Sequence, residues 1–328
     1  MAFRVSSVLV TGAGGFIGSH LAEKCVEDGH AVRAFVHYNS RNSLSWLEGS
    51  RYRKDLEIAA GDIRDYDAVY KAVKGTDLVF HLAALVGIPY SYVSPIAYVR
   101  TNVEGTYNVL QAAKDHNIQQ VILTSTSETY GTAQYVPIDE KHPVVAQSPY
   151  AASKIAADQL GLSFYRSYEL PVKLVRPFNV YGPRQSARAI VPTIITQILS
   201  GRTEIELGST TPTRDLTFVE DTVDGILRIS RADELYGQVT NIGMNEEISI
   251  ASLARRIARM IGTEIVIQTA AARVRPDKSE VEALRCDNAK LRECTGWEPR
   301  YSIETGLAAT IEWFGVNLNR YQPESYQI

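Results

Sequence analysis

The 328-residue sequence has little cysteine, little charge imbalance and no long apolar run, and each scarcity excludes a class of protein. Its three cysteines, Cys25, Cys286 and Cys294, are too few for a disulfide framework and indicate a reducing compartment. The 34 basic and 37 acidic residues give a net charge of -3, which offers no basic footprint for nucleic acid and no polybasic patch for a membrane surface. Small molecules are therefore the expected partners.

The chain also lacks the usual signals of membrane insertion, secretion and metal binding. No apolar run approaches the roughly 20 residues that a membrane-spanning helix needs, and the first predicted strand leaves no room for a signal peptide after Met1. We therefore expect a cytoplasmic protein. The six histidines do not cluster with cysteines or carboxylates at metal-ligand spacing, so we expect no metal.

Apolar strands alternate with helical patterns through the first half of the chain, as a doubly wound parallel α/β sheet requires. The predicted strands cover 5–10, 31–36, 56–60, 78–82, 120–123 and 172–176, and the predicted helices cover 16–27, 66–73, 95–116 and 150–169. After Pro177 the predicted elements are shorter: strands at 203–207 and 264–267, and helices at 191–200, 252–261 and 303–315. We predict a Rossmann-type dinucleotide-binding domain over 1–176, rejoined by parts of 215–245, and a smaller α/β substrate lobe mainly over 177–328.

A glycine-rich turn follows the first predicted strand. Gly12 permits the tight turn, Gly15 lets a pyrophosphate approach the backbone, and Gly18 allows the next helix to pack closely on the strand. Phe16 and Ile17 begin that helix, whose N-terminus favours phosphate charge. The order of strand, turn and helix predicts a dinucleotide site, and a glycine-rich turn without a ligand is the alternative.

The residues after the second predicted strand bear on which dinucleotide is bound. A NAD site usually presents a carboxylate to the ribose 2′-hydroxyl, yet no carboxylate occurs here before Glu48. A 2′-phosphate would instead meet Ser40, Arg41 and His37. NADP is therefore the preferred cofactor, NAD is the alternative, and Arg41 could also be a solvated surface charge.

Two further segments follow predicted strands where the adenine and the cofactor backbone would pass. These expected contacts are Asp62, Ile63, Leu82, Ala83 and Ala84, and Asn102 completes the set. His81 precedes the second segment, and we assign it no chemistry because such a histidine is more often a packed core residue.

Tyr150 and Lys154 are four residues apart in a predicted helix, so both side chains project from the same helix face. A nearby ammonium and an oxidised nicotinamide would lower the pKa of the phenol from its usual value of about 10, so that Tyr150 can act as a general base. Ser125 and Thr126 follow a buried strand of the same predicted sheet, which argues against an accidental pair.

These motifs together resemble the extended short-chain dehydrogenase/reductase family. The matching segments are Thr11-Gly-x-x-Gly-x-x-Gly18, Thr124-Ser-Thr-Ser-Glu128, Tyr150-x-x-x-Lys154, Arg176-Pro-Phe-Asn-Val-Tyr-Gly-Pro-Arg184 and Arg214-Asp-Leu-Thr-Phe-Val-Glu-Asp221. The resemblance implies an enzyme acting on nucleotide sugars, in which Thr126 binds the sugar 4-hydroxyl and assists the tyrosine. It also places Asn179 and Arg184 by the substrate pyrophosphate, Arg214 on the nucleotide, and a homodimer interface on the helices at 95–116 and 150–169.

Position 128 distinguishes the reactions of that family. Simple 4-epimerases have no use for a base aimed at C5, whereas 4,6-dehydratases carry a glutamate here, and Thr126-Ser127-Glu128 resembles the GDP-mannose type. In the expected reaction Tyr150 takes the 4-hydroxyl proton, the cofactor moves hydride from C4 to C6, and Glu128 removes the C5 proton before water leaves. Ser127 stands where the dTDP-glucose type has an aspartate, so Glu128 serves as both base and acid, or a water helps.

Segments 84–93 and 275–285 are similar to segments of dehydratases that act on nucleotide-linked N-acetylglucosamine in legionaminic-acid-type pathways. The resemblance thus implies GDP- or UDP-N-acetylglucosamine, with Tyr90 beside the hexose, Arg275 on a phosphate and Val191 among the substrate contacts. UDP-glucuronate decarboxylases share Thr-Ser-Glu but typically have Arg, then Ser or Cys, then Phe, where this chain has Arg214-Asp215-Leu216. A decarboxylase, a 4-epimerase and a non-catalytic nucleotide sensor on the same fold remain the alternatives.

Overall fold

The computed structural model describes residues 7–321, apart from the side chain of Asp277, and its largest element is a parallel sheet. The strand order is β11-β6-β5-β4-β1-β2-β3. The bounds are β1 (Ser7–Thr11), β2 (Ala31–His37), β3 (Leu56–Gly61), β4 (Leu78–His81), β5 (Gln120–Thr124), β6 (Val172–Pro177) and β11 (Val239–Ile242). All paired strands run in the same direction, which confirms the predicted doubly wound α/β fold. Val5 and Ser6 of the first predicted strand lie outside the described residues.

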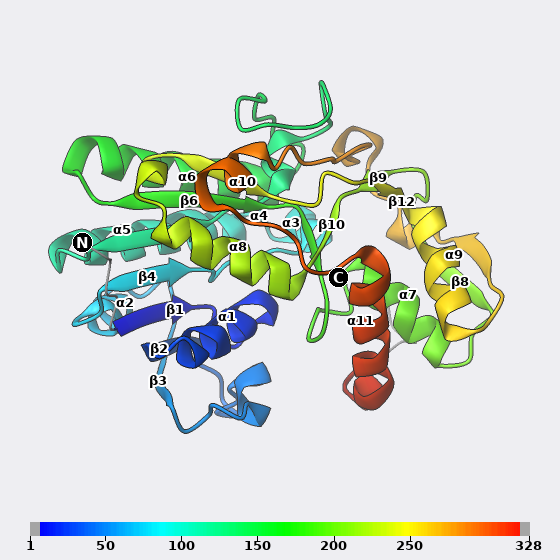
Figure 1. The fold of residues 1–328 in the computed structure, drawn as a ribbon, viewed down its shortest axis with the longest axis horizontal. Helices are drawn as coiled ribbons and strands as arrows, with labels where there is room; N and C mark the ends of the chain where they lie inside the picture. The colour runs from blue at the N-terminus through cyan, green and yellow to red at the C-terminus, as the bar shows by residue number, and fades with distance from the viewer. Residues whose placement is uncertain (1–6, 322–328) are drawn as a thin grey trace.

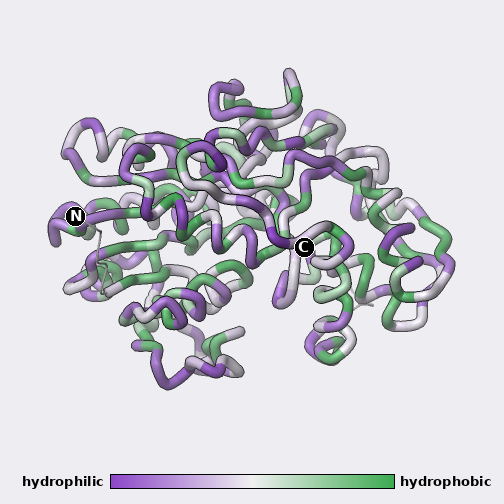
Figure 2. The backbone as a smooth tube through the Cα atoms, in the orientation of Figure 1, coloured by the Kyte–Doolittle hydropathy of each residue, from purple (hydrophilic) through white to green (hydrophobic). Residues whose placement is uncertain are grey.

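Helices cover both faces of this sheet (Figure 1). One face carries α1 (Phe16–Glu27) and α8 (Val219–Arg231), and the other carries α2 (Tyr66–Val73), α5 (Gly105–Asp115) and α6 (Pro149–Tyr168). A parallel sheet covered on both faces needs strands that are apolar on both sides, which explains the short continuous apolar runs in the sequence. Figure 2 shows hydrophobic stretches along the inner strands and hydrophilic stretches in many of the outer turns.

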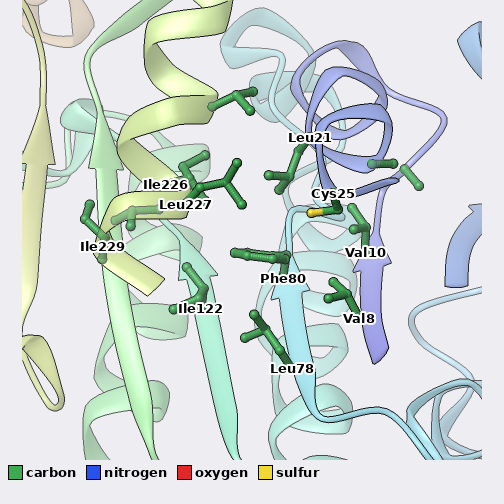
Figure 3. Close-up of a cluster of buried hydrophobic side chains, with 14 of the residues drawn as sticks. Val8, Val10, Leu21, Cys25, Leu78, Phe80, Ile122, Ile226, Leu227 and Ile229 are labelled. Carbon is green, nitrogen blue, oxygen red and sulfur yellow. The ribbon is translucent and has the colours of Figure 1, made fainter. Parts of the chain in front are cut away.

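Side chains from distant parts of the sequence form the core under α1 and α8. In Figure 3, Leu21 of α1, Phe80 of β4, Ile122 of β5 and Ile226 of α8 lie close together, and all four are almost completely buried. α8 was not predicted as a helix, although its residues pack against the first half of the chain. The chain therefore returns from the second lobe to place α8 and β11 on the main sheet.

The predicted single helix over 95–116 is interrupted in the structure. α3 (Ile88–Val93) and α4 (Pro95–Tyr98) lead into a π-helical turn, Val99–Glu104, which continues as α5. Gly105 follows the turn, and a Cβ there would come within 2.8 Å of the Ile63 side chain. The apolar period predicted the helix, but the wider turn depends on tertiary contacts around Asn102.

A smaller lobe lies beyond the carboxyl end of the sheet (Figure 1). Its helices are α7 (Ile190–Leu199), α9 (Ile250–Ile261) and α11 (Ile303–Asn317), which share a separate apolar core. Short strand pairs join them: β7 (Asn179–Tyr181) with β10 (Leu216–Phe218), β9 (Thr213–Arg214) with β12 (Ile248–Ser249), and β8 (Glu204–Leu207) with β13 (Val266–Thr269). α10 (Ala289–Thr295) returns to pack near α8 and β11.

Residues 7–321 contain neither a membrane-spanning helix nor a cluster of metal ligands. None of their helices has both the length and the apolar character needed to cross a membrane. Within the same part of the chain, no three His, Cys, Asp or Glu side chains are grouped as metal ligands would be.

Candidate active site

A cleft of about 1260 Å³ runs along the carboxyl ends of the sheet strands and faces the smaller lobe. Its walls include Gly12 after β1, Ala83 after β4 and Thr126 after β5, with Arg214 from the smaller lobe on the opposite side. Ligands of open α/β sheets bind at this edge. Most of the residues predicted for the cofactor and the substrate line this one cleft.

The glycine-rich turn fits a dinucleotide pyrophosphate. Gly12 has φ +71°, and a Cβ there would lie 2.9 Å from the Ala83 amide nitrogen. A Cβ at Gly18 would lie only 2.2 Å from the Gly12 carbonyl oxygen, so α1 and the turn can approach this closely only without side chains. Gly15 precedes α1, and Phe16 and Ile17 line the cleft at a helix start without an acidic first turn, which favours a bound anion.

The other predicted cofactor residues follow β2, β3 and β4. Asp62, Ile63, Leu82, Ala83 and Ala84 line the cleft, and so does His37. Arg64 holds the Asp62 carboxylate with a contact of 2.5 Å and lowers its pKa to about 2. The His37 Nε2 atom lies 3.7 Å from an Asp62 carboxylate oxygen, so the end of β2 lies beside a carboxylate that is already paired.

Ser40 and Arg41 are exposed and are not among the residues that line the cleft, so their contact with the cofactor stays a prediction. The Asn39 side chain accepts hydrogen bonds from the backbone nitrogens of Arg41 (3.1 Å) and Ser43 (3.0 Å). This Asx-type turn leaves Ser40 and Arg41 exposed, while Asn39, Ser43 and Ser45 line the cleft. The charges along this segment do not reveal the turn, because it depends on a side-chain hydrogen bond of Asn39.

Asn102 is not among the residues that line the cleft, and its contact with the cofactor stays a prediction. It is buried in the π-helical turn, where its Oδ1 accepts from the Leu85 nitrogen (2.8 Å) and its Nδ2 donates to the Leu85 oxygen (2.9 Å). The same Nδ2 donates to Ser153 Oγ (2.9 Å), and Ser153 Oγ donates to the Tyr150 carbonyl (2.7 Å). Asn102 therefore fixes the segment after β4 relative to the start of α6.

The predicted catalytic residues come together on one wall of the cleft. Thr126 begins a 3-10 helix, Ser127–Tyr130, and its Oγ1 accepts from the Glu128 backbone nitrogen (3.3 Å). Ser148 caps α6 by accepting from Ala151 (3.1 Å), which sets the first turn that carries Tyr150. The side chains that line the cleft here are Thr126, Ser127, Glu128, Tyr150 and Lys154.

Burial dominates the electrostatics of Tyr150. It raises the pKa of the phenol well above its usual value, a hydrogen bond with Thr126 opposes that rise, and the Glu128 charge adds to it. Lys154 and an oxidised nicotinamide were expected to lower this pKa, whereas within the protein the lowering effect comes from the hydrogen bond with Thr126. The Lys154 ammonium donates to the Thr124 carbonyl (2.8 Å), and its own pKa is lowered by burial and raised by Asp158.

A buried ion pair supports this wall from behind. Arg176 Nη2 donates to Asp158 Oδ2 at 2.8 Å, with side-chain exposures of only 5% and 2%. Ser125 Oγ donates to the same carboxylate oxygen (2.7 Å). Because Tyr150, Lys154 and Asp158 are spaced by four along α6, one helix face carries the phenol, the ammonium and the carboxylate that anchors β5 and β6.

The substrate side of the cleft carries arginines from the smaller lobe. Arg214 donates to the Val281 carbonyl (2.7 Å) and pairs with Glu280 (3.1 Å), and Arg275 lies 3.6 Å from the same carboxylate. Glu128 also acts on Arg214, since its charge raises the pKa that burial lowers. The cleft is also lined by residues predicted to bind the substrate, namely Asn179, Val191, Tyr90, Arg214 and Arg275. The buried Asn179 Oδ1 has no hydrogen-bond partner among the described residues.

Arg184 is not among the residues that line the cleft, and its place by the pyrophosphate stays a prediction. Its guanidinium pairs with Glu23 of α1 at 3.0 Å, and its φ of +71° marks a reversal of the chain after β7. This geometry joins the smaller lobe to the helix behind the glycine-rich turn. Gly87, Tyr98 and Arg188, which lie close together beside Tyr90, were not selected from the sequence, because their positions depend on how the two lobes meet.

The comparisons with known proteins agree with this geometry. The model of the family described as GDP-mannose 4,6 dehydratase matches residues 9–310. The chain belongs to this family. Its members and relatives include nucleotide-sugar dehydratases, decarboxylases and epimerases, and the resemblance to extended short-chain dehydrogenases/reductases is confirmed.

Three relatives illustrate the range of activities. The UDP-glucose 4-epimerase of Mycolicibacterium smegmatis is 34% identical over 312 residues, 93% of this chain and 97% of the relative. A UDP-N-acetyl-alpha-D-glucosaminuronate decarboxylase of Bacillus cytotoxicus is 32% identical, covering 93% and 97%. The crystal structure of DesIV, a dTDP-glucose 4,6-dehydratase of Streptomyces venezuelae with NAD bound, is 28% identical with a TM-score of 0.87, covering 97% and 99%. The similarity thus defines the family but spans several reactions.

Proposed function

We propose that this protein is a nucleotide-sugar 4,6-dehydratase that converts GDP- or UDP-N-acetylglucosamine to its 4-keto-6-deoxy form. The observation that carries the proposal is a second acid-base group in the cleft: Glu128 lies on the same wall as Thr126 and Tyr150, and its charge acts on the phenol. Removing a proton from C5 requires such a group, whereas epimerisation at C4 does not.

The residues that would hold the cofactor are those of the glycine-rich turn, the start of α1 and the segments after β2, β3 and β4. When bound, a nicotinamide dinucleotide accepts hydride from C4 and returns it to C6. We propose NADP, because the residues between β2 and Glu48 carry no carboxylate and Asp62 is neutralised by Arg64. NAD is the alternative, and DesIV was solved with NAD.

The chain's own residues divide the proton transfers. Tyr150 takes the proton from the sugar 4-hydroxyl, and Thr126 holds both groups through its hydroxyl. Lys154 places a positive charge behind the phenol while the Thr124 carbonyl orients it. Glu128 would remove the C5 proton, which the neighbouring 4-ketone acidifies, and deliver it to the hydroxyl leaving C6 as water, directly or through a water. Ser127 is too weak an acid to supply that proton. When hydride returns to C6, Glu128 would pass a proton from solvent to C5, and Tyr150 would release the 4-hydroxyl proton to solvent.

Cations of the smaller lobe would bind the substrate diphosphate. Arg214 and Arg275 both approach Glu280, so the phosphate oxygens would find two guanidinium groups already gathered by one carboxylate. Asn179, with a buried amide oxygen that lacks a protein partner, would lie along the same path. Val191 and Tyr90 would contact the nucleotide and the hexose, respectively.

Glu128→Gln tests the proposal. The wild-type protein, incubated with oxidised cofactor and each N-acetylglucosamine nucleotide, should give a product lighter by one water, with deuterium from D2O at C5. The variant should lose at least about 100-fold in turnover, at the lower end of the contribution of one acid-base group. Its dissociation constants for cofactor should stay unchanged, because Glu128 is not part of the glycine-rich turn. Full dehydratase activity in Glu128→Gln would contradict the assignment.

Decarboxylation of a nucleotide hexuronate is the second candidate, favoured by the shared Thr-Ser-Glu and by the decarboxylase relative. Against it stands Asp215, which is buried and accepts hydrogen bonds from the backbone nitrogens of Met244 (2.7 Å), Asn245 (2.9 Å) and Cys286 (3.0 Å). This residue is committed to holding loops of the smaller lobe. Release of carbon dioxide from UDP-glucuronate, without water loss from the acetamido sugars, would favour the decarboxylase.

We also propose a homodimer through the helices at 95–116 and 150–169. Large apolar side chains are exposed along them: Val99 is 48% exposed, Tyr107 44% and Tyr168 54%. Burying such a surface against a second copy would stabilise a dimer. Light scattering should give twice the chain mass, and Tyr107→Arg should shift the protein towards monomer. A monomeric wild type at micromolar concentration would contradict this proposal.

A further inference from the structure

Arg188 lies in the loop between β7 and α7 and lines the cleft. One of its guanidinium nitrogens is 3.6 Å from the point that a Cβ on Gly87 would occupy, and the Tyr98 hydroxyl is equally close to that point. The Tyr98 ring packs edge-on against the Tyr150 ring, with centroids 6.1 Å apart. Only the Tyr98 ring therefore separates Arg188 from the Tyr150 phenol, in the part of the cleft where the proposed function places the hexose.

The positive charge of Arg188 is not balanced by a carboxylate of the described residues, unlike the charges of Arg214 and Arg275. Arg214 and Arg275 share Glu280, whereas none of the carboxylates described in residues 7–321 forms an ion pair with Arg188. Its charge lowers the pKa of the Tyr98 phenol, although burial raises that pKa more. A guanidinium has five N–H donors and no acceptor, so a ligand at this place would meet several donors that are available for hydrogen bonding.

The surroundings of this guanidinium leave room for a ligand group. Gly87 has φ -74° and ψ 106°, a conformation open to any residue, so the backbone does not require glycine there. Its missing side chain leaves a notch beside Arg188, Tyr98 and Tyr90. Val86 lies next to it, lines the cleft and is 64% exposed. The notch thus combines hydrogen-bond donors with exposed apolar surface.

We propose that Arg188 is a specificity-determining residue, whose guanidinium donates hydrogen bonds to the carbonyl oxygen of an acetamido group on the hexose. The acetamido methyl would contact Val86 and Tyr90, which a bare hydroxyl or a carboxylate would leave uncovered. The inference rests on the proposed function, since it names the sugar substituent that the same site recognises. A site that hydrogen-bonds a substituent rejects analogues lacking it, because its donors then stay unpaired.

The test is the dissociation constant of UDP-N-acetylglucosamine and of UDP-glucose, measured by calorimetry with reduced cofactor bound so that no sugar is consumed. The GDP-linked pair is measured in the same way. Arg188→Met keeps the aliphatic part of the side chain but removes the hydrogen-bond donors. It should raise the dissociation constant of the acetamido sugar nucleotide at least 10-fold and change that of the glucose nucleotide less than twofold. Arg255→Met, at an exposed arginine of α9 outside the cleft, is the matched control and should change neither.

Equal weakening of both sugars would overturn the inference, since it would place Arg188 on the phosphates or in the fold. An unchanged dissociation constant for both sugar nucleotides in Arg188→Met would overturn the inference as well. Tight binding of UDP-glucuronate by the wild type that is lost in Arg188→Met would also overturn it. The readout does not depend on dehydration. If the wild type does not dehydrate the sugar but Arg188→Met loses the preference for the acetamido sugar, only the proposed function is contradicted. If the wild type dehydrates the sugar and Arg188→Met keeps that preference, only this inference is contradicted.

Discussion

The Asn102 amide donates to the Ser153 hydroxyl across 2.9 Å, and so joins the π-helical turn to the helix that carries Tyr150 and Lys154. The same amide holds both the nitrogen and the oxygen of Leu85. One side chain thus aligns the segment after β4 with the catalytic helix. This alignment explains why a buried asparagine can influence the cleft without lining it.

Asn102→Ala should therefore reduce both stability and turnover. It leaves the Leu85 N–H and C=O without their partner, which should cost about 1–3 kcal/mol in the free energy of unfolding. Urea unfolding measures the first effect, and kcat with an N-acetylglucosamine nucleotide measures the second. Ser153→Ala removes only one acceptor and leaves Leu85 held, so it should have the smaller effect on both. A larger effect of Ser153→Ala would show that Leu85 is not the important contact.

The pair between Asp158 and Arg176 makes a second prediction. Asp158→Asn would leave the Arg176 charge buried without a counter-charge, so the free energy of unfolding should fall by about 3–5 kcal/mol. The matched control is Asp224→Asn, which breaks a partly exposed pair with Arg228 and should cost less than about 1 kcal/mol. Chemical denaturation of the two variants checks the difference. Equal losses would mean that burial adds nothing to the Asp158 pair.

His81 should make stability depend on pH. It is buried between the hydroxyls of Thr11 (2.8 Å) and Thr106 (3.0 Å), and burial lowers its pKa from 6.5 to about 3. The unfolded chain therefore takes up the proton first as the pH falls, so stability present above pH 6.5 is lost between pH 6.5 and 3. At pH 5.5 this single group should cost about 1.4 kcal/mol relative to neutral pH.

Urea midpoints at pH 7.5 and 5.5 measure that loss for the wild type and for His81→Asn. The variant should be less stable overall, but its loss between the two pH values should be smaller by the amount given above. Other titrating groups contribute equally to both proteins. An identical loss in the variant would show that His81 does not titrate on unfolding in this range.

The cofactor preference gives a fourth prediction. Titration of protein fluorescence should yield a lower dissociation constant for NADP+ than for NAD+. Arg41 is exposed and outside the cleft, but it follows β2 closely, so its charge should attract a 2′-phosphate. Arg41→Ala should therefore raise the dissociation constant of NADP+ by a few fold and leave that of NAD+ unchanged. Arg53→Ala, at another exposed arginine of the same domain, should change neither constant. Tighter NAD+ binding by the wild type would reverse the preference.

Local patterns predicted most elements well because hydrophobic period and glycine placement act over a few residues. The helix at 16–27 begins and ends where expected, since the glycine-rich turn and Asp28 bound it on either side. The π-helical turn and α8 were not predicted, because the first depends on the buried contacts of Asn102 and the second on packing against α1, far away in the chain. The surroundings of Ser40, Arg41 and Arg184 were not predicted for a related reason, since one side-chain turn or one ion pair sets the position of each.

The sequence by itself determined the parallel sheet, the glycine-rich turn and the family motifs, because alternation of apolar strands and helices and the spacing of a few polar residues are local properties. Only the tertiary structure decided which residues face the cleft. The effect of the Glu128 charge on Tyr150 depends on how two segments of the first domain pack together. The gathering of Arg214 and Arg275 by Glu280 and the place of Arg188 beside Gly87 also depend on contacts between distant parts of the chain. Contacts between residues that are distant along the chain are set by packing of whole elements, which no short pattern encodes.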